Sequence, residues 1–351
     1  MILVQVAAIE EGMRLARDIL TPQGLLLIPR GFVLNAAVKN ILLNRGINEV
    51  WIYKREEEED NPLVKAEGDF FREYNRALAA VNRMMLRLSQ NQPFEGDDLR
   101  RAVLNLMPAV LTSPRIIYLL AKARHSGETL YTHALNVSVL SMLLGKWAGL
   151  DEGEIFRLGL AGVLHDIGKT KIEKSILEKR GLLSSGEWKI IKAHPGWGYI
   201  MALRSGIDDG RVLKAILQHH EREDGSGYPE GIAGKEIEPL AKAVMVADVF
   251  DAVTADRPYR RRFTIYHAAE VLQAMRFGQI DPAFATVFLE GLASYYVGNK
   301  VILSNGEIGE VVWVDRFNPT RPVVKVGEKF YNLLQCRDLR IEDELAIISE
   351  G

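Results

Sequence analysis

The sequence has very little of what marks secreted and membrane proteins. Cys336 is its single cysteine, so an internal disulfide is impossible and a reducing compartment is the simplest expectation. No apolar run approaches the roughly 20 residues that a membrane-spanning helix needs. The first residues, MILVQVAAIEEG, lack the basic start of a signal peptide. We therefore expect a cytoplasmic protein without a membrane segment.

The chain also lacks an excess of charge of either sign. Its formal net charge is −2 over 351 residues, and no basic stripe with interleaved aromatic residues is present. Binding to a nucleic-acid polymer therefore has little support. Hydrophobic residues make up 48% of the chain, an ordinary share for a globular protein of two or three domains.

Residues 1–55 are predicted to form a small α+β accessory domain. Leu25–Pro29 is a strand candidate, a helix is expected after Asn35, and INEVWIY is a second strand candidate. No residue here has catalytic spacing, so this part is expected to be a docking or sensing module that could bind protein partners. Residues 56–98 follow as an acidic linker, EEEEDNP, and a long amphipathic helix. The apolar face of that helix predicts core packing, and it could also mediate a homodimer.

The remaining sequence divides into a helical part, residues 99–297, and a β tail, residues 298–351. The helical part has no strand alternation, which predicts an all-α bundle. Its expected helices or helix pairs are Glu128–Gly149, Asp151–Gly168, Ser185–Arg204, Asp208–Arg222, Glu238–Asp256, Thr264–Phe277 and Pro282–Tyr296. In the tail, β-branched runs flank SNGE, a hairpin signal, and RPVVKV predicts a third strand. The predicted fold class is therefore mainly α.

A series of histidines and aspartates lies across the helical part. It is centred on AGVLHDIGKT, which has the pattern of the end of a buried helix. The members of the series are His133, His165, Asp166, His194, His219, His220 and Asp248. Successive gaps of 32, 28, 25 and 28 residues each match a helix with its connection. Each group can thus come from a different helix and point into one bundle interior, as in other bundle metal sites.

These residue types predict a metal centre. Imidazole and carboxylate ligands suit iron, manganese, nickel or zinc, and the absence of thiolate ligands argues against a structural zinc site. Because the series exceeds what one tetrahedral ion needs, we expect two ions with Asp166 as the bridge. A lone buried histidine is usually satisfied by a backbone carbonyl, and we assign that role to His125 and His267. For the whole series, burial without partners would cost several kcal/mol.

Two residues near the series are candidates for catalysis. Lys169 follows His165 by four residues and could neutralise charge on a bound anion. The alternative is a solvated lysine at a helix end that interacts with the helix dipole. Asp251 shares the helix face of Asp248 and could orient a ligand or the attacking water.

Two further segments could contact a ligand. EDGSGYPEGIAG directly follows the histidine pair, and this glycine-rich loop carries Tyr228 as its single aromatic residue. Arg257 and Arg260 are three residues apart and could form a clamp for a phosphate or a guanine edge. The alternative for these arginines is a solvated helix end.

Four motifs together resemble the HD-GYP proteins, a branch of the HD-domain metal-dependent phosphohydrolases. They are HDIGK at His165, HPGWG at His194, HHEREDGSGYP at His219, and DVFDAVTADRPYR at Asp248, and the resemblance covers about residues 100–296. It implies an HD-type helical domain. It also implies a phosphodiesterase that hydrolyses cyclic di-GMP to pGpG, and in some members onward to GMP, through a metal-bridging hydroxide.

The resemblance also implies roles for individual residues. The seven members of the series match the family's metal ligands, with Asp166 bridging, and two divalent ions, iron or manganese, are expected. Lys169 matches the lysine at the scissile phosphate, Gly227 and Tyr228 match the substrate loop, and Arg257 and Arg260 match a basic pair that binds phosphate or guanine. Members with three metals carry a glutamate where this chain has Thr129, so a third ion is doubtful.

Two other functions remain open at the level of sequence. The chain could be a receptor that binds cyclic di-GMP, or a protein partner, without turnover. It could also be an HD-type hydrolase for another nucleotide, such as ppGpp or a dNTP, although the GYP loop and the arginine pair disfavour this.

Overall fold

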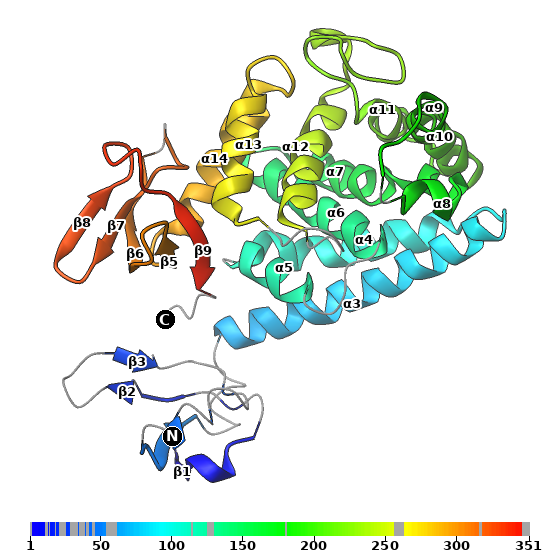
Figure 1. Ribbon diagram of the computed structural model, residues 1–351. Coiled ribbons are helices and arrows are strands. Elements are labelled where there is room, and N and C mark those ends of the chain that lie inside the picture. Colours follow the sequence, from blue (N-terminus) through cyan, green and yellow to red (C-terminus); the bar gives the residue numbers. More distant parts are fainter. Residues whose placement is uncertain are drawn as a thin grey trace.

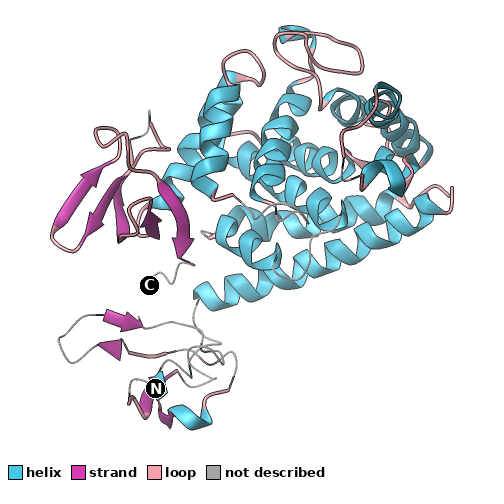
Figure 2. Cartoon of the chain, in the orientation of Figure 1, coloured by secondary structure: helices cyan, strands magenta, loops and turns pink. Residues whose placement is uncertain are grey.

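The computed structural model describes most of the chain. The described residues are 2–10, 13, 15–17, 19–20, 26–28, 34, 39, 42–43, 46–53, 62–113, 115–124, 130–179, 181–255, 263–315 and 318–345. Within these ranges, every helix is too short or too polar to cross a lipid bilayer. Helices predominate (Figures 1 and 2), which confirms the predicted mainly α fold class.

The N-terminal module contains two small antiparallel strand pairs. Strand β1 (Ile2–Gln5) pairs with β4 (Glu49–Ile52), and β2 (Ile19–Leu20) pairs with β3 (Leu26–Ile28); the short 3-10 helix η1 is Val6–Ala8. The predicted strands within Leu25–Pro29 and INEVWIY are present, whereas β1 was not predicted. Most of the helix expected after Asn35, and the acidic linker up to Asn61, lie outside the described residues.

The module has an apolar core of its own. Its buried members are Val6, Ile9, Leu15, Ile19, Leu34, Leu42, Val50 and Ile52. This cluster is separate from the core of the helical part, and in Figure 1 the module lies beside the start of the long helix α3 (Pro62–Ser89).

The helical part follows, and its elements agree with the predicted series. After α3 come α4 (Gly96–Thr112), α5 (Ile116–Arg124), α6 (Leu130–Trp147), α7 (Glu152–Leu164), η2 (Ile167–Lys171), α8 (Lys174–Leu177), α9 (Ser185–Lys192), α10 (His194–Arg204), α11 (Gly210–Gln218), η3 (Gly234–Glu236), α12 (Pro239–Thr254), α13 (Ile265–Met275) and α14 (Pro282–Tyr296). Helix α3 runs along one side of the others in Figure 1.

The helix starts are specified by capping residues. The Asp151 carboxylate accepts a hydrogen bond from the Glu154 N–H at the start of α7, and Asp209 does the same for two N–H groups of α11. At α9, Ser184 and Glu187 form a reciprocal capping box. Each cap satisfies donors that would otherwise lack partners, which fixes where the helix begins.

The centre of the bundle is the contact between α6 and α7. A side-chain carbon at Gly162 would lie 2.8 Å from the Ser138 Cα, so this close approach requires glycine. The Ser138 hydroxyl donates to the Gly159 carbonyl oxygen at 2.7 Å and holds the two helices together. His133 on α6 and the end of α7 are thereby placed side by side.

The C-terminal strands form one antiparallel sheet in the order β8-β7-β6-β5-β9. The strands are β5 (Lys300–Leu303), β6 (Ile308–Trp313), β7 (Val323–Val326), β8 (Lys329–Asn332) and β9 (Ile341–Leu345). The predicted hairpin joins β5 to β6 through a turn in which Gly306 has φ +83°, a conformation that favours glycine. Buried residues of this sheet, Val301 and Val311 among them, belong to the same apolar core as the helices.

Candidate metal centre

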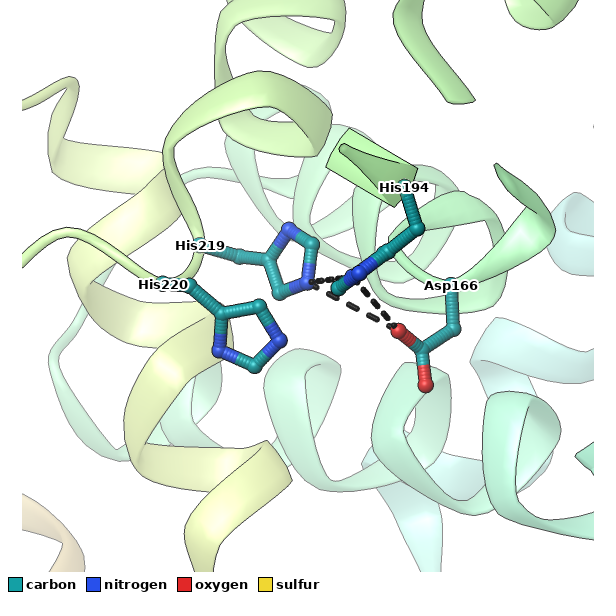
Figure 3. Close-up of side chains that lie close together, drawn as sticks. All are labelled: Asp166, His194, His219 and His220. Atoms are coloured by element: carbon teal, nitrogen blue, oxygen red, sulfur yellow. Dashed lines mark hydrogen bonds and ion pairs between the residues drawn. The ribbon is translucent and has the colours of Figure 1, made fainter. Parts of the chain in front are cut away.

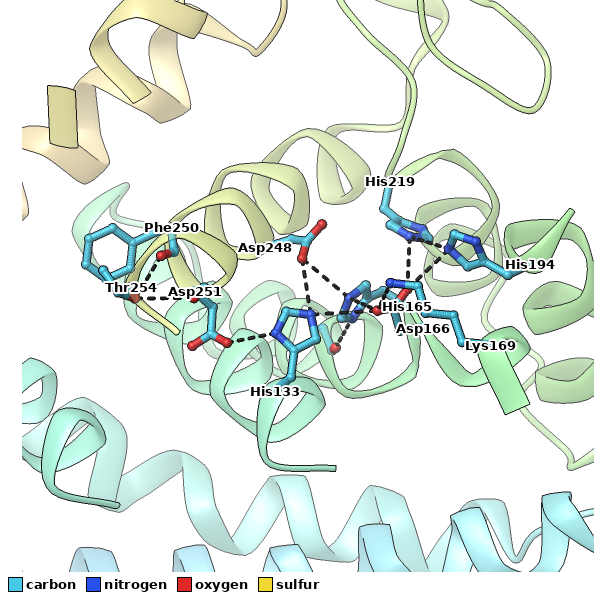
Figure 4. A network of polar contacts seen from close by, with 11 residues as sticks. His133, His165, Asp166, Lys169, His194, His219, Asp248, Phe250, Asp251 and Thr254 are labelled. Atoms are coloured by element: carbon cyan, nitrogen blue, oxygen red, sulfur yellow. Dashed lines mark hydrogen bonds and ion pairs between the residues drawn. The ribbon is translucent and has the colours of Figure 1, made fainter. Parts of the chain in front are cut away.

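The seven residues of the predicted series converge at one place in the bundle (Figures 3 and 4). His133 comes from α6, and Asp248 comes from α12. His165 and Asp166 lie in the turn that ends α7, and His194 is the first residue of α10. His219 and His220 lie in the turn after α11. Five separate helices or helix ends thus contribute side chains that are far apart in the sequence.

The side chains form two groups that share Asp166. Its Oδ2 lies 3.3 Å from the His165 Nε2 and 3.7 Å from the His133 Nε2, and Asp248 completes this first group. Its Oδ1 lies 3.2 Å from the His194 Nε2 and 3.7 Å from the His219 Nε2. We call the set of His133, His165 and Asp248 the first group, and the set of His194, His219 and His220 the second group. One carboxylate oxygen therefore faces each group.

Backbone carbonyls fix the orientation of three imidazoles. The Nδ1 atoms of His165, His194 and His219 lie 2.7 Å from the carbonyl oxygens of Gly162, Ile191 and Ile216, each three residues earlier. Because a carbonyl oxygen can only accept, each Nδ1 carries the proton and donates it. In the neutral rings, each Nε2 then presents a lone pair to the interior.

These inward-facing atoms are all acceptors. The Nε2 atoms of His194 and His219 are 3.2 Å apart and both face the Asp166 carboxylate. The His165 Nε2 and the Asp166 Oδ1 are buried without a hydrogen-bond partner. Lone pairs at this spacing repel unless a cation lies among them, and oxygen with imidazole nitrogen suits a divalent transition metal. The residues therefore fit a metal centre in which Asp166 belongs to the second group and also lies beside two histidines of the first, so that each group has four donors when Asp166 is counted in both.

His133 is held differently from the other histidines. Its Nδ1 lies 2.7 Å from the Asp251 Oδ2, and its Nε2 lies 3.2 Å from the Asp248 Oδ1. Burial lowers the pKa of this imidazole, but hydrogen bonds to the two carboxylates outweigh it and raise the pKa to about 10. The same contact lowers the pKa of Asp248, although burial opposes this. Asp251 is the orienting residue that the sequence suggested, and its partner is His133.

Burial affects the protonation of two histidines of the second group. Burial lowers the pKa of His219 to about 4 and holds the pKa of His220 well below its usual value. Burial would raise the pKa of Asp166, but its contacts with the His165 and His194 imidazoles and with the Lys169 ammonium group outweigh it and lower that pKa. At neutral pH the two histidines are deprotonated and Asp166 is ionised, which are the forms that bind metal.

Lys169 reaches the centre from the 3-10 turn η2. Helix α7 ends at Leu164, and this turn brings the Lys169 Nζ to 2.5 Å from the Asp166 Oδ2. Gly168 is required there, because a side-chain carbon would lie 1.9 Å from the His194 carbonyl oxygen. The glycine of the HDIGK motif thus lets two metal-ligand segments touch, a role that the sequence pattern did not reveal.

The glycine-rich loop lies against the second group. The Tyr228 ring stacks on the His220 ring with centroids 4.7 Å apart, and the Tyr228 N–H donates to the His220 carbonyl oxygen. A side-chain carbon at Gly227 would lie 2.4 Å from the Glu221 Cα, so this glycine lets the loop fold back on itself. Burial raises the pKa of the Tyr228 phenol, which keeps it protonated at neutral pH.

Glu221 is a functional candidate that sequence reasoning missed. Its side chain is fully buried, and its Oε1 accepts hydrogen bonds from the N–H groups of Glu230 and Gly231 at 2.7 and 3.1 Å. It therefore closes the loop that carries Tyr228. The sequence signal that could have identified it is its position directly after His219 and His220.

Some predicted residues cannot be placed. Arg257 and Arg260 lie outside the described residues, as do His125, Glu128 and Thr129. The arginine clamp therefore stays a prediction, and so does the expectation of two ions rather than three. The buried role expected for His267 is wrong, because this residue of α13 has a 41% exposed side chain whose Nδ1 lies 3.7 Å from the Glu270 Oε2.

Comparison with known proteins agrees with this arrangement. The family model of the HD domain matches residues 118–284. A cyclic di-GMP phosphodiesterase of Pseudomonas aeruginosa is 34% identical over 254 residues, which are 72% of this chain and 61% of that protein. A 3'3'-cGAMP-specific phosphodiesterase of Vibrio cholerae is 32% identical over 53% of this chain and 42% of that protein. The chain thus spans only about half of the length of these relatives.

A solved structure has the same fold. It is an HDGYP protein from Bdellovibrio bacteriovorus, with a TM-score of 0.55 and 16% identity over 82% of this chain and 97% of that one. At this identity the likeness concerns the fold alone.

Proposed function

Since the chain belongs to the HD-domain family and carries the HD-GYP motifs, we propose that it is a metal-dependent phosphodiesterase that hydrolyses cyclic di-GMP to pGpG. The observation that carries this proposal is the position of Asp166, whose two carboxylate oxygens each face one group of histidines. This is the donor arrangement that a pair of divalent ions requires.

The first group with Asp166 would hold one ion, and the second group with Asp166 would hold the other. Such a pair lowers the pKa of water and polarises a phosphoryl oxygen. We propose iron or manganese, because the donors are imidazole and carboxylate without thiolate. The expectation of two ions rather than three stays a prediction from the sequence. The same holds for a homodimer, for protein partners of the N-terminal module and for a cytoplasmic location.

The chain's own residues would complete the site. Lys169 is already beside the Asp166 carboxylate, and its ammonium group would neutralise negative charge on the phosphoryl oxygens in the transition state. Asp251 would hold the His133 ring so that its Nε2 faces the centre. Gly227 lets the loop fold tightly, and Tyr228 would stand at the substrate side of His220. Arg257 and Arg260 are proposed to bind a phosphate or a guanine edge.

A related substrate is a second candidate. The Vibrio cholerae relative is specific for 3'3'-cGAMP, a cyclic dinucleotide with one guanine replaced by adenine. Both substrates carry the same two phosphodiesters, so the metal centre alone does not distinguish them.

The test is hydrolysis by protein purified without oxygen and loaded with Fe²⁺ or Mn²⁺. We expect conversion of cyclic di-GMP to pGpG, read by anion-exchange chromatography, with the bound metal quantified in the same samples. Chelator-treated protein is the control, and 3'3'-cGAMP, ppGpp and a dNTP form the substrate panel. Binding of cyclic di-GMP without any product would favour a receptor and contradict the proposal. Faster hydrolysis of another nucleotide would identify that nucleotide as the substrate in place of cyclic di-GMP.

A further inference from the structure

The loop that carries Tyr228 is tied to the histidine pair by the residues on both sides of that pair. Glu221 directly follows His220, and its side chain is fully buried. Its Oε1 accepts hydrogen bonds from the N–H groups of Glu230 and Gly231 at 2.7 and 3.1 Å. Because these two residues closely follow Tyr228 in the chain, Glu221 fixes the backbone just beyond the tyrosine.

Gln218, which precedes the histidine pair, holds the same part of the loop. This last residue of α11 is buried, and its Nε2 donates to the Glu230 Oε2 at 3.1 Å. Its Oε1 accepts from the Glu238 N–H at 2.9 Å, directly before α12, the helix that carries Asp248. The two residues that flank the histidine pair therefore meet at Glu230, one through its backbone and the other through its side chain.

The position of Tyr228 depends on this attachment. Its N–H donates to the His220 carbonyl oxygen at 3.1 Å, and its ring stacks on the His220 ring with centroids 4.7 Å apart. Because Gly227 lies against the Glu221 backbone, the loop turns back on itself, and the Glu221 side chain closes that turn. Loss of the closure would leave the segment after Tyr228 free to move away from the histidine pair.

Stability alone does not account for a glutamate at this place. Burial of a carboxyl group costs free energy unless hydrogen bonds compensate it, and the Glu221 Oε2 is buried without a hydrogen-bond partner among the described residues. Glu236, another glutamate of the same loop, is exposed and accepts from the Ala233 N–H within a single turn. Only the first of these two glutamates links the loop to the metal-binding histidines.

We propose that Glu221, assisted by Gln218, is a positioning residue that holds Tyr228 at the substrate side of His220 and so sets the affinity for the cyclic dinucleotide. This rests on the proposed function, because it assumes that Tyr228 contacts the bound nucleotide. A ring that is already fixed loses no further conformational freedom when the nucleotide binds, and binding is stronger for that reason. Glu221 acts on the substrate through the tyrosine and does not itself touch it.

The first experiment measures kcat and KM for cyclic di-GMP with protein loaded with Fe²⁺ or Mn²⁺. Glu221→Ala removes the acceptor of both N–H groups, whereas Glu221→Gln keeps an amide oxygen that can accept from them. Glu236→Ala is the matched control, because it removes an exposed glutamate of the same loop that does not reach the histidine pair.

We expect Glu221→Ala to raise the KM about tenfold and to change kcat by less than about twofold, because the metal centre is intact. Glu221→Gln should recover most of the affinity, and Glu236→Ala should match the wild type. A fall in kcat with an unchanged KM, or loss of a bound ion from Glu221→Ala in metal analysis, would place this residue in the metal centre and overturn the proposal.

The second experiment determines whether Glu221 acts through Tyr228. In the Tyr228→Ala background, Glu221→Ala should raise the KM by less than about twofold, because the ring that it positions is absent. A similar rise in both backgrounds would show that the two residues act independently and would overturn the positioning role. If Glu221→Ala does not fold, as judged by circular dichroism, Gln218→Ala is measured in the same two backgrounds, and the same comparison decides.

Binding separates failure of the positioning role from failure of the proposed function. Titration calorimetry of metal-loaded protein measures the Kd for cyclic di-GMP in the wild type and in the Glu221 variants. A weaker Kd in Glu221→Ala that is restored in Glu221→Gln, without hydrolysis by any form, would support the positioning role and contradict the enzyme. Hydrolysis by the wild type, with unchanged KM and Kd in Glu221→Ala, would support the enzyme and overturn the positioning role.

Discussion

The two groups around Asp166 both contain histidine rings, but these rings lie in different electrostatic environments. In the first group, the His133 Nδ1 is held by the Asp251 carboxylate, and Asp248 faces its Nε2. In the second group, His194 and His219 donate to neutral backbone carbonyls. The first group is therefore more anionic, and a carboxylate behind a histidine increases its basicity as a ligand. We expect the first group to hold its ion more tightly than the second.

The largest change should come from the residue that both groups share. Asp166→Asn removes the negative charge from both, so we expect loss of both ions and a fall in phosphodiesterase activity of about 1,000-fold or more. Metal analysis and product chromatography measure the two effects. Asp208→Asn is the control, because that side chain is 88% exposed and pairs with Arg100. A variant that kept both ions would contradict the shared bridge.

A smaller and one-sided effect should follow from Asp251→Asn. The amide cannot supply the negative charge behind His133, so the affinity of the first group should fall roughly 10- to 100-fold while the second is unchanged. A competitive metal titration, in which the number of ions bound per chain is also measured, resolves the two sites. Glu270→Gln on α13 serves as the control, because Glu270 belongs to an exposed pair with His267. Equal weakening of both sites would show that the two groups do not differ in this way.

The smallest effect should be a dependence of stability on pH in the metal-free protein. The pKa of His219 falls from 6.5 to about 4 on folding, so its contribution is present above pH 6.5 and is lost as pH decreases toward 4. The loss is about 3 kcal/mol. The pKa of His133 rises to about 10, so its contribution is present below pH 6.5 and is lost as pH increases toward 10.

Thermal unfolding of chelator-treated protein from pH 4 to pH 10 measures both slopes. His219→Gln should flatten the acid side, and Asp251→Asn should flatten the alkaline side. His267→Gln, at an exposed position, should leave both unchanged. If the acid slope persisted in His219→Gln, burial of that imidazole would not be its cause.

Much of the helical fold followed from pattern, because apolar spacing and capping residues act locally. Asp151 and Ser184 begin helices where the sequence places a side-chain acceptor before an apolar repeat. The convergence of the histidines was also predictable, since each lies one helix and one connection from the next. The boundaries of the four predicted domains stay predictions.

Contacts between distant segments were harder to predict. That Gly168 touches the His194 carbonyl, or that Glu221 closes the loop at Glu230, depends on the way in which helices pack, and no local pattern encodes it.

The N-terminal module and the C-terminal sheet differ in whether each could be replaced without exposing the apolar core of the helices. The N-terminal module buries Val6, Leu15 and Val50 in an interior of its own, so its replacement by an unrelated fold would leave the interior of the helices covered. The C-terminal sheet shares its interior with the helices through Val301 and Val311, and its removal would open that interior to water. Recombination would therefore exchange the N-terminal module without exposing the core of the helices, whereas the C-terminal sheet would have to be inherited together with them.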